Sequence, residues 1–244
     1  MEKNGFTVLD VTIPYGANYT ITGPDCQILT INLKTGERVE TEPGSMMYMS
    51  SGIHSSVECG QCSRMCAGET LCKSVYTNQD SSDGFVALTP NFPAKVLPVD
   101  LAAFRGKLIA KSGAYMASIG DVKVAVNFDC CSCTCCCGGL GMTRQEASGS
   151  GTIFLAAGGT ILKKELMANE TICVDHSSVV GFEESVKFGI KRAGGCCTCL
   201  FGGEGLFVNT LQGPGSVYIQ SMSFEKYKQA VALPDNQQAS PGIA

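Results

Sequence analysis

A pattern of short strands and turns that recurs three times constrains the fold of this chain more than any other feature. Each occurrence contains runs of alternating apolar and polar residues, then a cysteine-rich segment, and then a glycine that opens a last apolar run. The three glycines, Gly84, Gly151 and Gly215, are separated by 67 and 64 residues. A near-constant period indicates one supersecondary unit that is used repeatedly. We therefore expect three repeats, at about residues 27–94, 95–160 and 161–222.

The composition indicates that these repeats consist of β-strands. The 244 residues include 29 glycines and no tryptophan, and only 16% of them are charged. Runs of Val, Ile, Thr and Ser broken by Gly and Pro favour many short strands over helices. The alternation of Val122, Val124 and Val126 would bury one face of a sheet. We predict an all-β fold with a single domain over residues 1–222, in which three antiparallel repeats pack around a shared core. A short helix or an extended tail is expected at 223–244.

Twelve of the 15 cysteines fall into three clusters, one in each repeat. They are Cys59, Cys62 and Cys66; Cys130, Cys131, Cys133, Cys135, Cys136 and Cys137; and Cys196, Cys197 and Cys199. We expect the clusters at equivalent hairpin tips. The other three cysteines, Cys26, Cys72 and Cys173, lie alone in strand-like runs and are interpreted as small apolar core residues.

The clusters have the spacing and the ligand type of a soft-metal site. The spacings C-x-x-C at 59 and 62, and C-x-C at 131 and 133 or 197 and 199, allow two thiolates to chelate one ion. The adjacent pairs Cys130-Cys131 and Cys196-Cys197 suit a polynuclear thiolate cluster better than an isolated ion. The first hypothesis is therefore a non-enzymatic binding or scaffold protein that holds Zn or Cu(I) at the twelve cysteines.

The same twelve cysteines allow a second hypothesis, S-palmitoylation. Leu200 and Phe201 follow Cys199, and the basic residues Arg64, Lys191 and Arg192 are close to clusters. Cysteines beside apolar and basic residues suit acylation, and several acyl chains would anchor the protein to a membrane surface. A third interpretation is that the thiols have no function under reducing conditions.

The amino-terminal sequence and the charge bear on the compartment and on the partners. The start, MEKNGFTVLDVTIP, has neither the apolar segment of a secretory signal nor the arginines of a transit peptide. We therefore expect reduced thiols and a cytoplasmic protein, which the second hypothesis would associate with a membrane surface. A net charge of −4 and a pI near 5.2 argue against nucleic acid as a partner.

The sequence offers little for catalysis. The tripeptide Asp175-His176-Ser177 contains the residue types of a triad, but adjacent residues on a strand would point to opposite faces. The GGEG segment at 202–205 lacks the lysine of a phosphate-binding loop. Glu37, Glu170 and Glu204 lie at turn edges, where charged residues usually face water. We expect no catalytic residues and no enzyme activity.

Several segments resemble one known family. They are VD at 174–175, FGGEGLF at 201–207 and GPGSVYIQS at 213–221. Together they resemble the altered-inheritance-of-mitochondria family over roughly residues 27–222. The resemblance implies a fold similar to the tryptophan RNA-binding attenuation protein, of the double-stranded β-helix type, with three pseudo-symmetric repeats packed as a β-prism. It also implies homo-oligomers, to which exposed β edges would contribute. It implies no activity, and the chain departs from the family at its three cysteine-rich tips.

Overall fold

The computed structural model describes residues 2–9, 18–59, 72–104, 107–128, 143–192 and 207–232. Within them the chain consists of antiparallel strands with two short 3-10 helices and a carboxy-terminal α-helix. Three strands precede the repeating part: β1 (Glu2–Lys3), β2 (Phe6–Val8) and β3 (Tyr19–Thr22). The remaining strands form three groups of six, which we call units 1, 2 and 3.

The three units follow one another along the chain. Unit 1 contains β4 (Ile28–Leu33), β5 (Arg38–Thr41), β6 (Met46–Met49), β7 (Ile53–Cys59), β8 (Cys72–Asn78) and β9 (Gly84–Leu88). Unit 2 contains β10 (Lys95–Asp100), the 3-10 helix η1 (Leu101–Phe104), β11 (Lys107–Lys111), β12 (Tyr115–Ile119), β13 (Val122–Phe128), β14 (Thr143–Gly149) and the first half of β15 (Thr152–Leu166). Unit 3 contains the second half of β15, then β16 (Thr171–Val174), the 3-10 helix η2 (His176–Ser178), β17 (Val179–Glu183), β18 (Lys187–Arg192), β19 (Phe207–Gln212) and β20 (Gly215–Met222).

One pairing scheme occurs in all three units. The sixth strand of each unit pairs with the first and the third strands, as β9 pairs with β4 and β6. The fifth strand pairs with the second and the fourth, as β8 pairs with β5 and β7. The third strand has a register irregularity at the same point in each unit, at Met47, Met116 and Val180. Because the register agrees residue by residue, equivalent positions of the three units can be compared directly.

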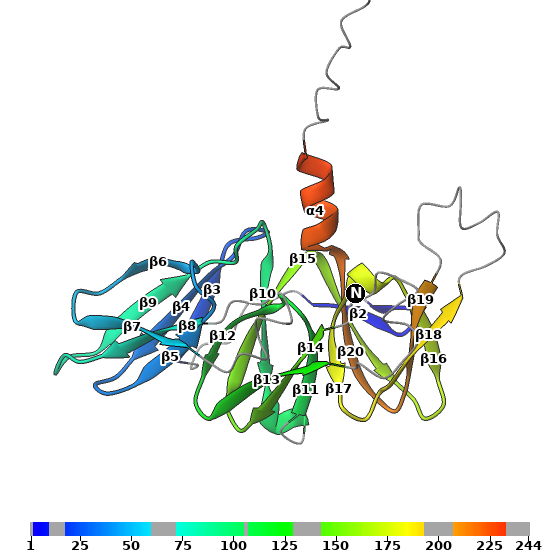
Figure 1. Cartoon of the computed structure of the whole chain (residues 1–244), viewed down its shortest axis with the longest axis horizontal. Coiled ribbons are helices and arrows are strands. Elements are labelled where there is room, and N and C mark those ends of the chain that lie inside the picture. The colour runs from blue at the N-terminus through cyan, green and yellow to red at the C-terminus, as the bar shows by residue number, and fades with distance from the viewer. Residues whose placement is uncertain are drawn as a thin grey trace, which may run out of the picture.

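Neighbouring units are joined by the third strand of one unit and the second strand of the unit before it. β12 of unit 2 pairs with β5 of unit 1, and β17 of unit 3 pairs with β11 of unit 2. These joins make one 13-stranded sheet, which bends through the long strand β15. Figure 1 shows the result as a row of three units, with unit 1 at the left and unit 3 at the right.

Each end of the row has a smaller sheet with a free edge. At one end the four-stranded sheet β3-β4-β9-β6 ends at β6, and at the other the three-stranded sheet β16-β19-β18 ends at β16. The two sheets lie at opposite ends of the longest axis (Figure 1). Within the described residues, therefore, the strands form an open row and no closed barrel.

The hydrophobic cores also follow the units. The core of unit 1 includes Met116 and Phe154 of unit 2, and the core of unit 2 includes Val180 and Tyr218 of unit 3. The core of unit 3 surrounds Leu211 and receives residues only from units 2 and 3. Units 1 and 2 thus each have a core that the following unit completes.

A single α-helix follows unit 3 in the described part of the chain. Helix α4 (Phe224–Val231) begins after Ser223, whose hydroxyl accepts a hydrogen bond from the N–H of Lys226 at 3.1 Å. A serine at this position satisfies one of the free N–H groups of the first turn. The helix extends away from the row of strands (Figure 1).

The prediction of an all-β fold with antiparallel sheets is confirmed. The packing of three repeats as a β-prism is not confirmed, since the outer sheets lie at opposite ends of an open row and do not meet.

Candidate functional site

The cysteine clusters are attached to the same hairpin of each unit, between the fourth and the fifth strand. The first cluster begins at Cys59, the last residue of β7, and the second lies between β13 and β14. The third lies between β18 and β19. Eleven of the twelve candidate cysteines, all except Cys59, lie outside the described residues. Their anchoring strands are described and occupy equivalent places.

The register shows that the three hairpins extend to the same side of the row. β5 runs toward the side of the row where the first cluster begins. Its last residue, Thr41, pairs with Ser74, two residues after Cys72, the first residue of β8. β12 starts beside Thr41 and follows directly from β11, which runs toward the next hairpin. The same connection leads from β11 to β17 and the third hairpin. The described ends of the three hairpins, where the strands lead into the cysteine clusters, therefore lie on one side of the row.

Two contacts between a cation and an aromatic ring join neighbouring units near the hairpins. Lys73 Nζ, next to Cys72, lies 5.4 Å from the ring centroid of Tyr115 in unit 2. The guanidinium carbon of Arg144 lies 4.2 Å from the ring centroid of Phe188 in unit 3. Such contacts contribute on the order of 0.5–1 kcal/mol at exposed sites. They link the hairpin strands of adjacent units.

The structure corrects the interpretation of all three lone cysteines as core residues. Cys72 lies opposite Cys59 in the β7–β8 pair, with the Cα atoms 4.0 Å apart and the sulfurs bonded as a disulfide. Cys173 is exposed on the edge strand β16, because the alternation of that strand turns Val174 inward. Cys26 is exposed in the loop before β4. The strand-like pattern had indicated extended backbone without indicating which face is buried.

No metal site is complete within the described part of the chain. Among these residues there is no group of three or more His, Cys, Asp or Glu side chains that could hold an ion. Cys59 and Cys72 could provide two adjacent thiolates when reduced, and the remaining ligands would have to come from outside the described residues. None of the helices within the described ranges has the length and apolar composition needed to cross a membrane.

The tripeptide Asp175-His176-Ser177 does not form a triad, although the structural reason differs from the one expected. These residues lead into and form η2 instead of continuing a strand. The Ser177 hydroxyl donates directly to the Asp175 carboxylate, which also accepts from Lys226 Nζ at 3.1 Å. The serine is therefore bound to the acid and not to His176, so the imidazole is not positioned to take its proton.

Charge near η2 shifts the pKa of three groups. Burial would raise the pKa of Asp175, but the hydrogen bonds from Ser177 and Lys226 keep this pKa below its ordinary value. The pKa of Glu225 is lowered in the same way, since the effect of burial is outweighed by its contact with Lys111. The pKa of His176 is lowered, mainly by burial and then by the positive charge of Lys111. Two ion pairs attach α4 to the strands, Asp175 with Lys226 at η2 of unit 3 and Glu225 with Lys111 at β11 of unit 2.

Two of the glutamates considered as acids stabilise turns at equivalent positions. Glu37 accepts a hydrogen bond from the N–H of Lys34 at 2.9 Å, and Glu170 accepts from the N–H of Met167 at 2.9 Å. Glu170 also contacts Lys164 Nζ at 3.0 Å. Both close the turn between the first and the second strand of their unit. Glu204 lies outside the described residues.

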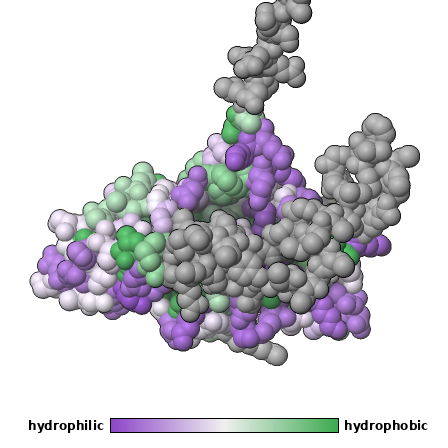
Figure 2. Space-filling view, viewed as in Figure 1, coloured by the Kyte–Doolittle hydropathy of each residue, from purple (hydrophilic) through white to green (hydrophobic). Residues whose placement is uncertain are grey.

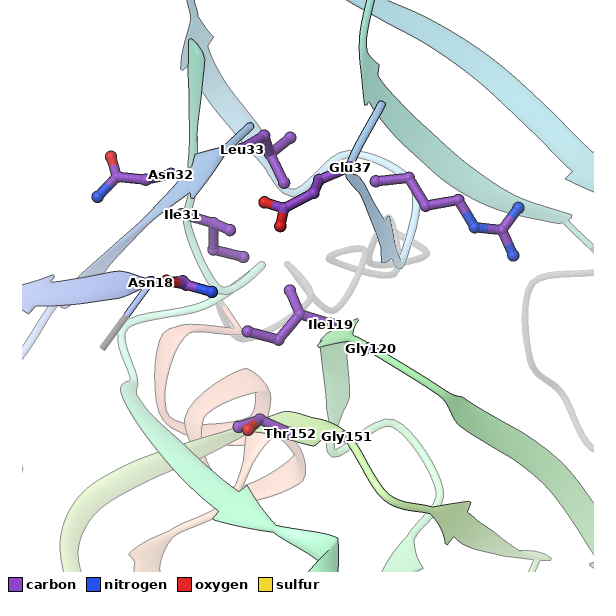
Figure 3. Close-up of a pocket in the computed structure, with 10 residues that line it drawn as sticks. Asn18, Ile31, Asn32, Leu33, Glu37, Ile119, Gly120, Gly151 and Thr152 are labelled. Atoms are coloured by element: carbon purple, nitrogen blue, oxygen red, sulfur yellow. The ribbon is translucent and has the colours of Figure 1, made fainter. Parts of the chain in front are cut away.

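A pocket of about 420 Å³ lies between units 1 and 2. Figure 3 shows its lining, which comes from the ends of β4 and β12, the turn before β5, and the start of β15. Its charged residues are Glu37, already bound to the Lys34 N–H, and Arg38. At the next junction the corresponding turn is replaced by η1, and its Phe104 packs 6.0 Å from the ring of Tyr218. The pocket thus reflects a shorter linker and offers no acid–base pair.

Comparison with known families identifies the family of the chain. Residues 19–222 match the family described as "Mitochondrial biogenesis AIM24". The chain belongs to this family. The match covers all three units and ends at the last residue of β20, so the three units together constitute the family domain.

Two bacterial relatives are similar over nearly their whole length. An uncharacterized protein of Streptococcus pyogenes serotype M6 is 25% identical over 212 residues, which cover 82% of this chain and 83% of that protein. The crystal structure of a Streptococcus pyogenes protein is similar with a TM-score of 0.68 and 24% sequence identity. The similarity covers 87% of this chain and 96% of that one. The solved structure supports the fold.

Proposed function

We propose that this family member is a non-enzymatic binding or scaffold protein whose cysteine-rich hairpins bind soft metal ions as thiolates. The observation that supports the proposal concerns the strands that flank the three clusters. They are the fourth and fifth strands of every unit, and their described ends lie on one side of the row. Thiolates brought to one side can share ions, and Zn and Cu(I) prefer such ligands.

The pair of Cys59 and Cys72 gives the proposal a redox requirement. Only the thiolate binds metal, so the disulfide between these residues must be reduced before Cys59 can act as a ligand. A reducing compartment would keep the pair reduced. Cys72 was not among the candidate ligands. Because reduction of the disulfide also frees the thiol of Cys72, we add it to them.

The experiment is elemental analysis of the full chain purified under reducing conditions. We expect zinc or copper bound at a fixed ratio to protein. Replacement of the six cysteines from Cys130 to Cys137 by serine should remove most of it. The matched control replaces the exposed lone cysteines, Cys26→Ser and Cys173→Ser, and should leave the metal content unchanged. A metal content near zero in the unaltered protein would sink the proposal.

The alternative is a peripheral membrane protein that is S-palmitoylated at the same hairpins. The exposed Lys191 beside the third cluster would suit an anionic membrane surface. In this case the serine variant should leave the membrane fraction and lose a thioester-linked mass, whereas the purified protein should contain no metal. The two proposals therefore predict opposite results from one variant.

A further inference from the structure

The two outer sheets of the row are the two halves of the sheet that occurs between neighbouring units. The sheet joining units 2 and 3 contains, in order, β13, β14, β11, β17, β20 and β15, with β2 added at its end. Its first half consists of the fourth, fifth and second strands of unit 2. The same three strands of unit 3 form the outer sheet β18-β19-β16. Its second half consists of the third, sixth and first strands of unit 3. The same three strands of unit 1 form the outer sheet β6-β9-β4, and β3 pairs with β4 as β2 pairs with β15.

Among the described residues, the core of unit 3 has no residue from a following unit, whereas the cores of units 1 and 2 are each completed by a third-strand residue of the next unit. That residue is Met116 in the core of unit 1 and Val180 in the core of unit 2, and each is at most 2% exposed. The equivalent residue of unit 1 is Met47, which is 55% exposed. Its neighbours Met46 and Tyr48 are also exposed, whereas Tyr115 and Ala117 of unit 2 are buried at the same positions. Figure 2 shows pale green, apolar residues over this end of unit 1.

Several edges that remain free in the described row carry protecting residues, whereas the two end strands and the outer strand β3, with the sequence YTIT, do not. Edge strand β10 contains Pro98, and β13 and β18 contain Lys123, Lys187 and Lys191. Proline and charged side chains are the usual protection of an edge against pairing. β6 has the sequence MMYM and β16 the sequence TICV, without a charge or a proline. Both strands are therefore suited to pair with another strand.

We propose that copies of this chain associate head to tail, with β6 of one copy pairing antiparallel to β16 of the next. The register follows from the two joins inside the chain. Ser118 pairs with Glu40, and Phe182 pairs with Ile109. The equivalent pair between copies is Met49 with Cys173, flanked by Tyr48 with Val174. Met47 would then enter the core of unit 3 of the next copy.

The proposed interface is heterologous, because different surfaces of the two copies meet. Such an interface produces a closed ring or an extended filament. A continuous row would also bring the third cysteine hairpin of one copy next to the first of the following copy. The proposal does not depend on metal or lipid at those hairpins.

The first test is the mass of the full chain in solution, measured by light scattering under reducing conditions. We expect a multiple of the 25.6 kDa chain mass. Met47→Lys should shift the protein to the mass of a single chain while its circular dichroism spectrum stays the same, since the side chain is exposed in the single copy. The matched control is Val57→Lys on β7, a residue 64% exposed on an edge that is free in every unit. A single-chain mass for the unaltered protein, or equal dissociation by both variants, would overturn the proposal.

The second test fixes the register. Met49→Cys places a thiol opposite Cys173 of the next copy, and mild oxidation should link the two into species larger than one chain on non-reducing gels. Peptide mass spectrometry should identify the 49–173 link, and Cys173→Ser in the same background should abolish it despite the other cysteines. A 49–173 link found within single chains would show closure of the row on itself and contradict head-to-tail association, as would a persistent oligomer without this link.

Discussion

At the residue scale, buried polar side chains at equivalent positions have different environments. Gln145 and Asn209 both lie on the fifth strand of their unit and are each 1% exposed. Gln145 Oε1 accepts a hydrogen bond from the N–H of Tyr115 at 3.3 Å. Neither polar atom of the Asn209 side chain has a partner among the described residues. An unpaired buried amide is costly, whereas a paired one is not.

This difference predicts opposite effects of two matched substitutions. Asn209→Leu should leave the free energy of unfolding unchanged or raise it by about 1 kcal/mol, because it removes buried polar atoms without partners. Gln145→Leu should lower it by about 1–3 kcal/mol, because the N–H of Tyr115 loses its acceptor. Urea unfolding followed by circular dichroism measures both changes. Destabilisation by Asn209→Leu as large as that by Gln145→Leu would show that the Asn209 amide has a partner.

Residue environments were also the least predictable from the sequence. Cys26 and Cys173 were expected in the core and are exposed, and Cys72 pairs with Cys59. The alternation of Cys173 and Val174 is compatible with either face being buried, and the packing of β16 on the core of unit 3, where Val174 lies, decides it. The pairing of Cys59 with Cys72 depends on the register of β7 and β8, which follows from where the hairpin starts and ends.

At the element scale, the attachment of helix α4 depends on charges that titrate. Asp175 with Lys226 and Glu225 with Lys111 join the helix to η2 and β11. The folded pKa of each carboxylate is lowered, so its contribution to stability is present above the unfolded pKa and is lost as the pH falls. The folded pKa of His176 is also lowered, so protonation of this residue favours the unfolded state in the same direction.

The predicted result is a loss of stability on the acid side. The midpoint of thermal unfolding should begin to fall near pH 6.5, the ordinary value for His176, and should fall further near pH 4.5, the ordinary value for Glu225. Lys226→Met should reduce the second fall, because Asp175 loses its partner charge. Scanning calorimetry from above pH 6.5 to below pH 3.8, the ordinary value for Asp175, measures both. A midpoint independent of pH in the unaltered chain would contradict the assignment.

The elements themselves were largely predictable, with one informative exception. The strands follow the alternation of apolar residues and the glycines that open β9 and β20, and the helix after residue 222 follows the cap at Ser223. The segment at 176–178 was expected to be extended but forms η2. A serine and aspartate sequence offers local hydrogen bonds that compete with strand pairing, and the Ser177–Asp175 contact is of this kind.

At the scale of the whole molecule, the period of the sequence indicated three units but not how they join. The joins pair strands far apart in the sequence, such as β5 with β12 and β11 with β17. Such long-range pairing leaves no periodic signal in either strand, because alternation shows which face is buried and not which neighbour lies beside an edge. The resemblance to the family implied a prism, whereas the sheets of the described residues form an open row. The unprotected ends of that row become apparent only from the structure.

Hydrogen exchange at the backbone amides of β6 and β16 tests most directly whether the ends of the row complete one another. If β6 of one copy pairs with β16 of the next, the amides of both strands should be protected in the assembled protein about as well as those of β12 and β17, which have partners on both sides. Met47→Lys should then accelerate exchange in β6 and β16 and leave β12 and β17 unchanged. Rapid exchange of β6 and β16 in the unaltered protein, at the rate found in the variant, would contradict the account.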